Sequence, residues 1–157
     1  MRLFCELLKD SKRSDRELAK LLGVSQPTVT RTRHKLVREG WVRQFTVVPD
    51  FLKMGFTILA ISCFQSQLNN GVGEGAGMRA LSKPNVVYAA ECHCMGMNAV
   101  VFSLHKSYSD YVKFLREFRA ENGADLRKEE SLIISLEGSA IKSFGFKHLA
   151  EAMQEEG

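Results

Sequence analysis

The segment from Ser25 to Gly40 gathers side chains suited to contact a phosphate backbone or the edges of bases. Its basic side chains are Arg31, Arg33, His34, Lys35 and Arg38. A single acid, Glu39, opposes them, and Gln26, Thr28 and Thr30 add polar groups near the start. Arginine and amide side chains read bases in the major groove, while lysine and arginine bind phosphates. The segment is therefore expected to contact DNA, the alternative being a solvated basic helix.

Two short helices joined by a three-residue turn are expected to hold this segment. Ser14 to Glu17 has the spacing of a capping box, so a helix begins there and ends at Gly23. Ser25 can cap a second helix that runs from about Gln26 to Glu39. The first helix has an apolar stripe, whereas the second has a narrow seam formed by Val29, Leu36 and Val37. Such a pair is typical of a helix-turn-helix, whose second helix enters the major groove.

The run that follows, residues 41–50 (WVRQFTVVPD), is rich in β-forming residues and long enough for a hairpin-like wing. Arg43 would be an exposed member of this wing, and Trp41 would pack between the wing and the helices. An additional helix near residues 3–8 would complete a three-helix core. The full set of predicted DNA-contacting residues is Ser25, Gln26, Thr28, Thr30, Arg31, Arg33, His34, Lys35, Arg38 and Arg43.

Charge is distributed unevenly along the 157 residues. Residues 1–50 contain 11 Lys and Arg against 6 Asp and Glu, whereas residues 51–157 contain 11 against 12. A basic N-terminal region joined to a nearly neutral remainder favours a nucleic-acid partner. We find no apolar run long enough to span a bilayer and no signal peptide, so we expect a cytoplasmic protein with reduced cysteines.

We predict an α+β fold, with a winged helix-turn-helix over 1–50 and a ferredoxin-like β-α-β-β-α-β domain over 51–157 that ends in a C-terminal tail. Short apolar runs predict strands over 55–64, 86–92, 99–104 and 131–136. A strong helix is expected over 107–123, where Ser107 and Asp110 have capping-box spacing, and a weaker helix over 74–82.

The predicted strands are apolar on both faces, yet two helices can cover only one face of a four-stranded sheet. Monomeric proteins rarely expose an apolar patch of that size. A second copy of the chain, packed sheet against sheet, is the simplest cover. The sequence therefore predicts a homodimer with two DNA-reading helices.

Together these segments resemble the Lrp/AsnC family, the feast/famine transcription regulators. Residues 17–42 (ELAKLLGVSQPTVTRTRHKLVREGWV) resemble the family's helix-turn-helix, and residues 47–56 (VVPDFLKMGF) resemble its linker into the second domain. The resemblance implies promoter binding, assembly of dimers into octamers or similar rings, and small effectors, often amino acids. It places the effector near the loop between the second and third strands, which here contains Met95, Gly96, Met97 and Asn98 after Cys94.

The chain departs from the family's pattern in three places. It begins within the first helix, whereas the family usually has a longer lead with acidic residues. Position 33, commonly aliphatic in the family, is Arg33, whose stem can lie on the core or point at DNA. The effector loop has Asn98 where an acid is usual, so it brings hydrogen bonds without charge.

Cys92, His93 and Cys94 are soft metal ligands, but on a strand only the two cysteines share a face, so buried free thiols are the simpler interpretation. A metal- or redox-sensing regulator is an alternative. No nucleophile and base have catalytic spacing. We predict a protein that is not an enzyme and has no cofactor or metal. A siroheme-decarboxylase-like enzyme, which shares the two-domain architecture, is the enzymatic alternative.

Overall fold

The computed structural model describes residues 1–66, 82–122, 126–138, 140–142 and 144–155. The chain separates into two compact units. The helical unit comprises residues 1–48 and 142–157, and the sheet unit comprises residues 49–141. The weaker helix predicted over 74–82 lies mostly outside the described residues. None of the described helices is long and apolar enough to cross a membrane.

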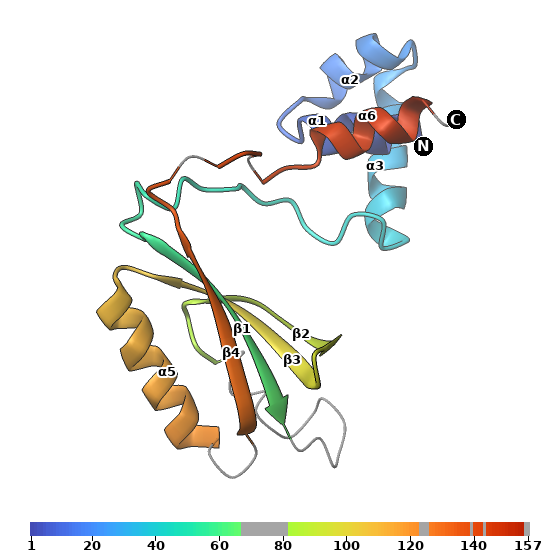
Figure 1. Ribbon diagram of the computed structural model, residues 1–157. Helices are drawn as coiled ribbons and strands as arrows, with labels where there is room; N and C mark the ends of the chain where they lie inside the picture. The colour runs from blue at the N-terminus through green and yellow to red at the C-terminus, as the bar shows by residue number, and fades with distance from the viewer. Residues whose placement is uncertain (67–81, 123–125, 139, 143, 156–157) are drawn as a thin grey trace. The chain divides into compact units, whose positions relative to one another are not determined.

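The helical unit contains α1 (Arg2–Lys9), α2 (Asp15–Leu22), α3 (Gln26–Arg38) and α6 (Lys147–Glu155) (Figure 1). The predicted capping box forms at Ser14, whose side chain accepts from the Glu17 amide while the Glu17 carboxylate accepts from the Ser14 amide. Gly23 then ends α2 with a left-handed backbone, φ 67°. The three-residue turn and the start of α3 at Gln26 are as predicted.

The core of the helical unit is small and continuous. Its buried residues are Leu3, Leu7, Leu18, Ala19 and Val29, and Leu22 and Leu36 pack against them. Only Val29 of α3 is fully buried, so most of this helix faces outward. Val37, which was expected to join the apolar seam, is exposed.

The hairpin-like wing expected over 41–50 does not form. These residues are extended but belong to no strand. A hairpin needs a second strand, and no described segment hydrogen-bonds to this one as a strand. Trp41 remains about half exposed and contacts the Phe4 ring edge-on, with 5.8 Å between centroids.

The C-terminal tail belongs to the helical unit, not to the sheet unit as the predicted boundary 51–157 had it. Helix α6 packs along α1. Ala150 is the buried residue of this helix, and Gln154 hydrogen-bonds to Glu6 and Lys9 of α1. The physical reason is that the enclosed carboxylate of Glu6 on α1 needs hydrogen-bond donors, and Gln154 of α6 provides one.

The sheet unit contains β1 (Ile58–Ser66), β2 (Val86–Cys94), β3 (Met97–His105), α5 (Tyr108–Asn122) and β4 (Leu126–Ser135). The strands pair antiparallel in the order β2-β3-β1-β4, which is the ferredoxin-like order that was predicted. Strand β4 begins at Leu126, earlier than the apolar run indicated, because its charged first half pairs with the end of β1.

Helix α5 covers one face of this sheet (Figure 1). It is capped as predicted, since the Asp110 amide donates to the Ser107 hydroxyl over 3.1 Å. Phe114 and Phe118 pack on Phe64 and Val101 to form the core of the sheet unit. Tyr108 at the start of the helix is exposed, whereas Phe114 points inward.

Candidate nucleic-acid interface

The outward side of α3 carries the predicted contact residues that have no intramolecular role. The side chains of Gln26, Arg31, His34, Lys35 and Arg38 are exposed, as is Arg43 beyond the helix. In the described part of the chain, Arg31, Arg38 and Arg43 form no hydrogen bond or ion pair, and Lys35 approaches Glu39 at only 3.8 Å. These cations are therefore available to an anionic partner.

A shallow open hollow marks the N-terminal half of α3. It is lined by Gln26, Pro27, Thr30, Arg31 and His34. Pro27 lies in the first turn of α3, where its missing N–H would have had no intrahelical partner. An amide, an imidazole and a guanidinium thus surround one concave surface, which suits hydrogen bonding to base edges.

Three predicted contact residues hold the helix instead of leaving their hydroxyls free. Ser25 is the N-cap: its hydroxyl accepts from the Thr28 amide over 3.3 Å and bonds to the Thr28 hydroxyl over 2.8 Å. The Thr30 hydroxyl donates to Asp15 of α2 over 2.6 Å. These bonds fix the start of α3 and its position against α2.

Arg33 is the predicted contact residue that the structure places most differently from the others. Its guanidinium donates to the Asp15 carboxylate over 2.8 Å and to the Arg13 carbonyl over 3.2 Å. The same group lies over the Phe45 ring, 5.6 Å from its centroid. With only 19% of its side chain exposed, Arg33 is directed into the helical unit.

Asp15 is the acid that organises this part of the helical unit. The hydrogen bond from Thr30, followed by the hydrogen bond and charge of Arg33, holds the pKa of Asp15 below its ordinary value, although burial opposes this. The carboxylate is therefore ionised at neutral pH and joins α2 to α3.

The predicted effector loop is a two-residue hairpin turn between β2 and β3. Cys94 pairs with Met97, and Met95 and Gly96 between them have φ values of 50° and 82°. Two positive φ values are typical of a type I′ turn. Met95 is 81% exposed and Met97 is buried, so the loop residues do not share one surface.

The Cys-His-Cys motif lies at the end of β2. The Nδ1 atom of His93 contacts its neighbour's carbonyl, that of Cys92, at 2.7 Å. Within the residues described, no three His, Cys, Asp or Glu side chains are grouped closely enough to hold a metal ion.

Two polar groups were not foreseen from the sequence. Glu6 lies among the apolar positions of α1, a placement that signals a need for partners, and it is buried with Lys9, Arg13 and Gln154 around it. The hydrogen bond from Lys9, followed by that from Gln154, holds the pKa of Glu6 below its ordinary value, although burial opposes this. His105 is completely buried in the sheet unit, with its Nε2 atom 2.8 Å from the Ser103 hydroxyl.

The arrangement described so far defines a helix-turn-helix protein with a ferredoxin-like second unit, and comparison with known proteins gives the same class. The MarR family model matches residues 11–46, which contain α2 and α3. The HTH-type transcriptional regulator LrpC of Bacillus subtilis is 31% identical over 100 residues, covering 60% of this chain and 67% of LrpC.

Solved structures agree over nearly the whole chain. A transcriptional regulator of Neisseria meningitidis, solved as a complex with L-Met, has a TM-score of 0.77 at 14% identity and covers 94% of this chain and 95% of its own. A feast or famine regulatory protein of Mycobacterium tuberculosis, solved with L-methionine, has a TM-score of 0.76 at 20% identity and covers 90% and 91%. The chain belongs to the Lrp/AsnC family of DNA-binding transcription regulators.

Proposed function

We propose that this protein binds duplex DNA through α3 as a homodimer or a higher oligomer, and that a small molecule modulates the binding. The observation that carries the proposal is the exposed, unpaired cationic side of α3. Gln26, Arg31 and His34 would meet base edges, while Lys35, Arg38 and Arg43 would meet phosphates. Ser25, Thr28 and Thr30 would act mainly by fixing the helix start.

The open face of the sheet supports self-association. Strand register places Ile61 of β1 between Phe102 of β3 and Leu132 of β4, and it places Leu59 beside Ile134 of β4. These residues lie opposite the face on which α5 packs, and Leu132 is 60% exposed. Since the partner must be apolar and flat, a second copy of the same sheet is the occupant that we propose.

An amino acid is the effector class that we propose. Two structural relatives were solved with L-methionine. In this chain Met95, Gly96 and Asn98 at the β2-β3 turn would contribute to a site completed by another copy. We propose this site between dimers, as the resemblance to the family implies, and Asn98 would offer hydrogen bonds to an ammonium or carboxylate group.

The relatives bear the names of regulators, and we propose regulation without catalysis for this chain as well. It would act in the cytoplasm, with DNA as its macromolecular partner. Incubation with siroheme followed by mass spectrometry tests the enzymatic alternative, because loss of a carboxylate would contradict our proposal.

Selection of bound duplexes from fragmented genomic DNA tests the proposal directly. We expect the full-length protein to enrich a small set of related sequences. Replacing Arg31 with Ala should weaken binding to these sequences by about 1–3 kcal/mol and relax preference at one or two positions. Replacing Arg116 with Ala removes an exposed arginine from α5 and should leave binding unchanged.

Equal recovery of all fragments by the wild-type protein would contradict sequence-specific binding. Equal effects of the two substitutions would contradict the role of α3. Repeating the selection with L-methionine and other amino acids shows whether an effector changes the bound set, and no change with any of them would remove the effector proposal.

A further inference from the structure

The Arg33 side chain is largely enclosed, and most of its N–H donors have acceptors. Two atoms of its guanidinium lie 2.8 Å from the same Asp15 oxygen, and one of them also donates to the Arg13 carbonyl over 3.2 Å. The guanidinium carbon also lies over the Phe45 ring, 5.6 Å from its centroid. A planar group with five donors can make these contacts together, whereas an ammonium cannot.

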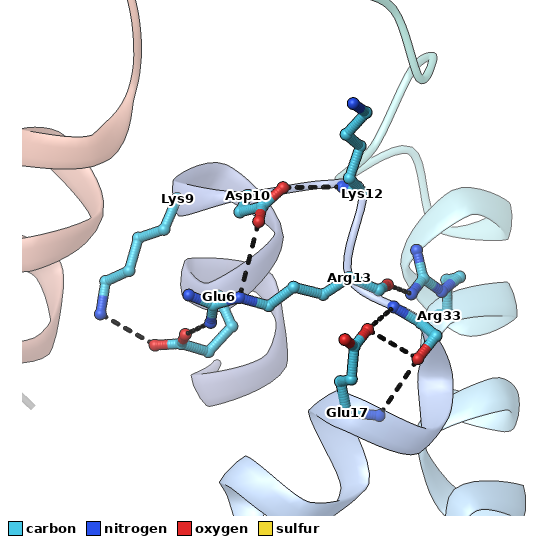
Figure 2. A network of polar contacts seen from close by, with 8 residues as sticks. Glu6, Lys9, Asp10, Lys12, Arg13, Glu17 and Arg33 are labelled. Carbon is cyan, nitrogen blue, oxygen red and sulfur yellow. Dashed lines mark hydrogen bonds and ion pairs between the residues drawn. The ribbon is translucent and has the colours of Figure 1, made fainter.

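The contacts of Arg33 continue into a longer polar network, part of which is shown in Figure 2. Arg13 receives the Arg33 donor on its carbonyl, and its own guanidinium donates to the Glu6 carboxylate over 2.7 Å. Glu6 also accepts from Gln154 of α6 over 3.2 Å. The network thus runs from the recognition helix α3 to the C-terminal helix α6, entirely within the helical unit.

Phe45, which contacts Arg33, and α6, which contains Gln154, lie near the two chain segments that lead to the sheet unit. The chain leaves the helical unit after residue 48, shortly beyond Phe45, and returns to it at residue 142, shortly before α6. Any displacement of either segment therefore acts first on Phe45 or on α6. Phe45 contacts Arg33 of α3 directly, whereas α6 reaches Arg33 through Glu6 and Arg13.

We propose that Arg33 is a positioning residue that does not contact DNA, and that its network couples the two connecting segments to the orientation of the recognition helix. This inference rests on the proposed function of α3 and adds the means by which that function is regulated. It also gives a physical role to an arginine at a position that is commonly aliphatic in the family.

Three single variants of the full-length protein test the proposal: R33K, R33M and D15N. Each is measured for affinity to the strongest selected duplex and to a scrambled duplex of equal composition, over a range of salt concentrations, at a temperature well below its melting midpoint. R38M is the matched control, because it removes an exposed arginine of the same helix that we assign to a phosphate contact.

If Arg33 positions α3, R33K and R33M should both lower the ratio of selected to scrambled affinity by roughly tenfold, which corresponds to about 1.4 kcal/mol. The slope of affinity against salt should stay as in the wild type. R38M, by contrast, should reduce that slope by about 1, because we assign Arg38 to a phosphate.

D15N gives the sharpest discrimination. Removing a negative charge near α3 should by itself strengthen binding to any duplex. A fall in the affinity ratio with D15N, together with no further fall in the D15N/R33M double variant, would support positioning through the Asp15–Arg33 pair.

Other outcomes overturn the inference. Nearly wild-type behaviour of R33K with a reduced salt slope in R33M would make Arg33 a phosphate contact. Unchanged affinity ratios in folded R33M and D15N would reduce the network to a contribution to stability. A wild-type protein that does not distinguish the two duplexes would instead contradict the proposed function itself.

Coupling to the connecting segments has its own readout. F45A and Q154A should each lower the affinity ratio in the same direction as R33M, although neither residue belongs to α3. If both variants bind the two duplexes as the wild type does, the network ends at Arg33 and the coupling is refuted.

Discussion

The helical unit and the sheet unit differ in how far each completes its own interactions. The helical unit encloses a small core and leaves its exposed surface polar and cationic on α3. The sheet unit packs α5 on one face and leaves Leu132, Ile134 and Tyr88 exposed on strands β4 and β2. An exposed cationic helix calls for an anionic partner, whereas an exposed apolar sheet calls for another apolar surface.

This difference means that the two units should fail in different ways when they are altered. Damage to the sheet face should change assembly without unfolding the chain. Damage to the helical core should unfold one unit and leave the other folded, because the described cores do not share residues.

Leu132→Asp should have the largest effect. A charge at the centre of the proposed interface should convert the protein to a monomer, and the loss of a second DNA-reading helix should lower affinity for a two-half-site duplex on the order of a hundredfold. Light scattering coupled to gel filtration measures the mass. Ile141→Asp, at a fully exposed position outside the strands, is the control. An unchanged mass for the Leu132 variant would contradict self-association through the open face of the sheet.

Leu18→Ala should destabilise the helical unit by about 2–5 kcal/mol, because the side chain is completely buried. Leu21→Ala on the same helix removes a side chain that is more than half exposed and should cost less than about 0.5 kcal/mol. Hydrogen exchange resolves the units separately. Equal loss of protection in β1 and β3 would show that the two units unfold together.

Ser14→Ala should cost about 1 kcal/mol in the helical unit through loss of the N-cap of α2. Ser11→Ala, at an exposed position in the preceding turn, is the matched control and should have little effect. Chemical denaturation measures both variants. Similar losses in the two would mean that the capping box does not contribute.

The smallest expected effect is a loss of stability of the sheet unit on acidification, which should be absent at pH 7.5. Burial lowers the pKa of His105, and the charge of Asp110 offsets this only partly. Below pH 6.5, the ordinary pKa of histidine, His105 is protonated in the unfolded chain but remains neutral in the folded sheet unit. The sheet unit should therefore lose stability as pH falls below 6.5. His105→Gln should remove the dependence, and its persistence in that variant would assign it to another group.

The helical unit should respond to acid later. The lowered pKa values of Glu6 and Asp15 give stability that is present above their ordinary values of 4.5 and 3.8 and is lost as pH falls below them. Hydrogen exchange between pH 7.5 and 5.5 should therefore show weakening in the sheet unit first. The reverse order would contradict these assignments.

Helix starts and ends could be predicted because their signals are local. The Ser14 and Ser107 caps and the Gly23 end each depend on residues within one or two turns, and all three were located correctly. The prediction of a wing over 41–50 was wrong because a strand needs more than local signals. β-forming residues indicate an extended backbone, but whether it becomes a strand depends on a partner elsewhere.

The predicted interface residues also divide into those whose exposure follows from local spacing and those whose place depends on distant neighbours. Exposed cations such as Arg31 and Arg38 can be named from their spacing on a helix. Arg33 has the same residue type and the same helix, yet it turns inward because Asp15 and Phe45 are brought beside it. Spacing along α3 contains no information about those two neighbours.

By itself, the sequence determined the caps, the apolar runs and the uneven charge, and with them the two-unit architecture and the cationic helix α3. Only the tertiary structure decided that the C-terminal helix joins the N-terminal one, that Glu6 and Arg33 are enclosed, and that His105 is buried. Capping and periodicity act between near neighbours, whereas the cost of burying a charged or polar group depends on partners that are far away in the chain.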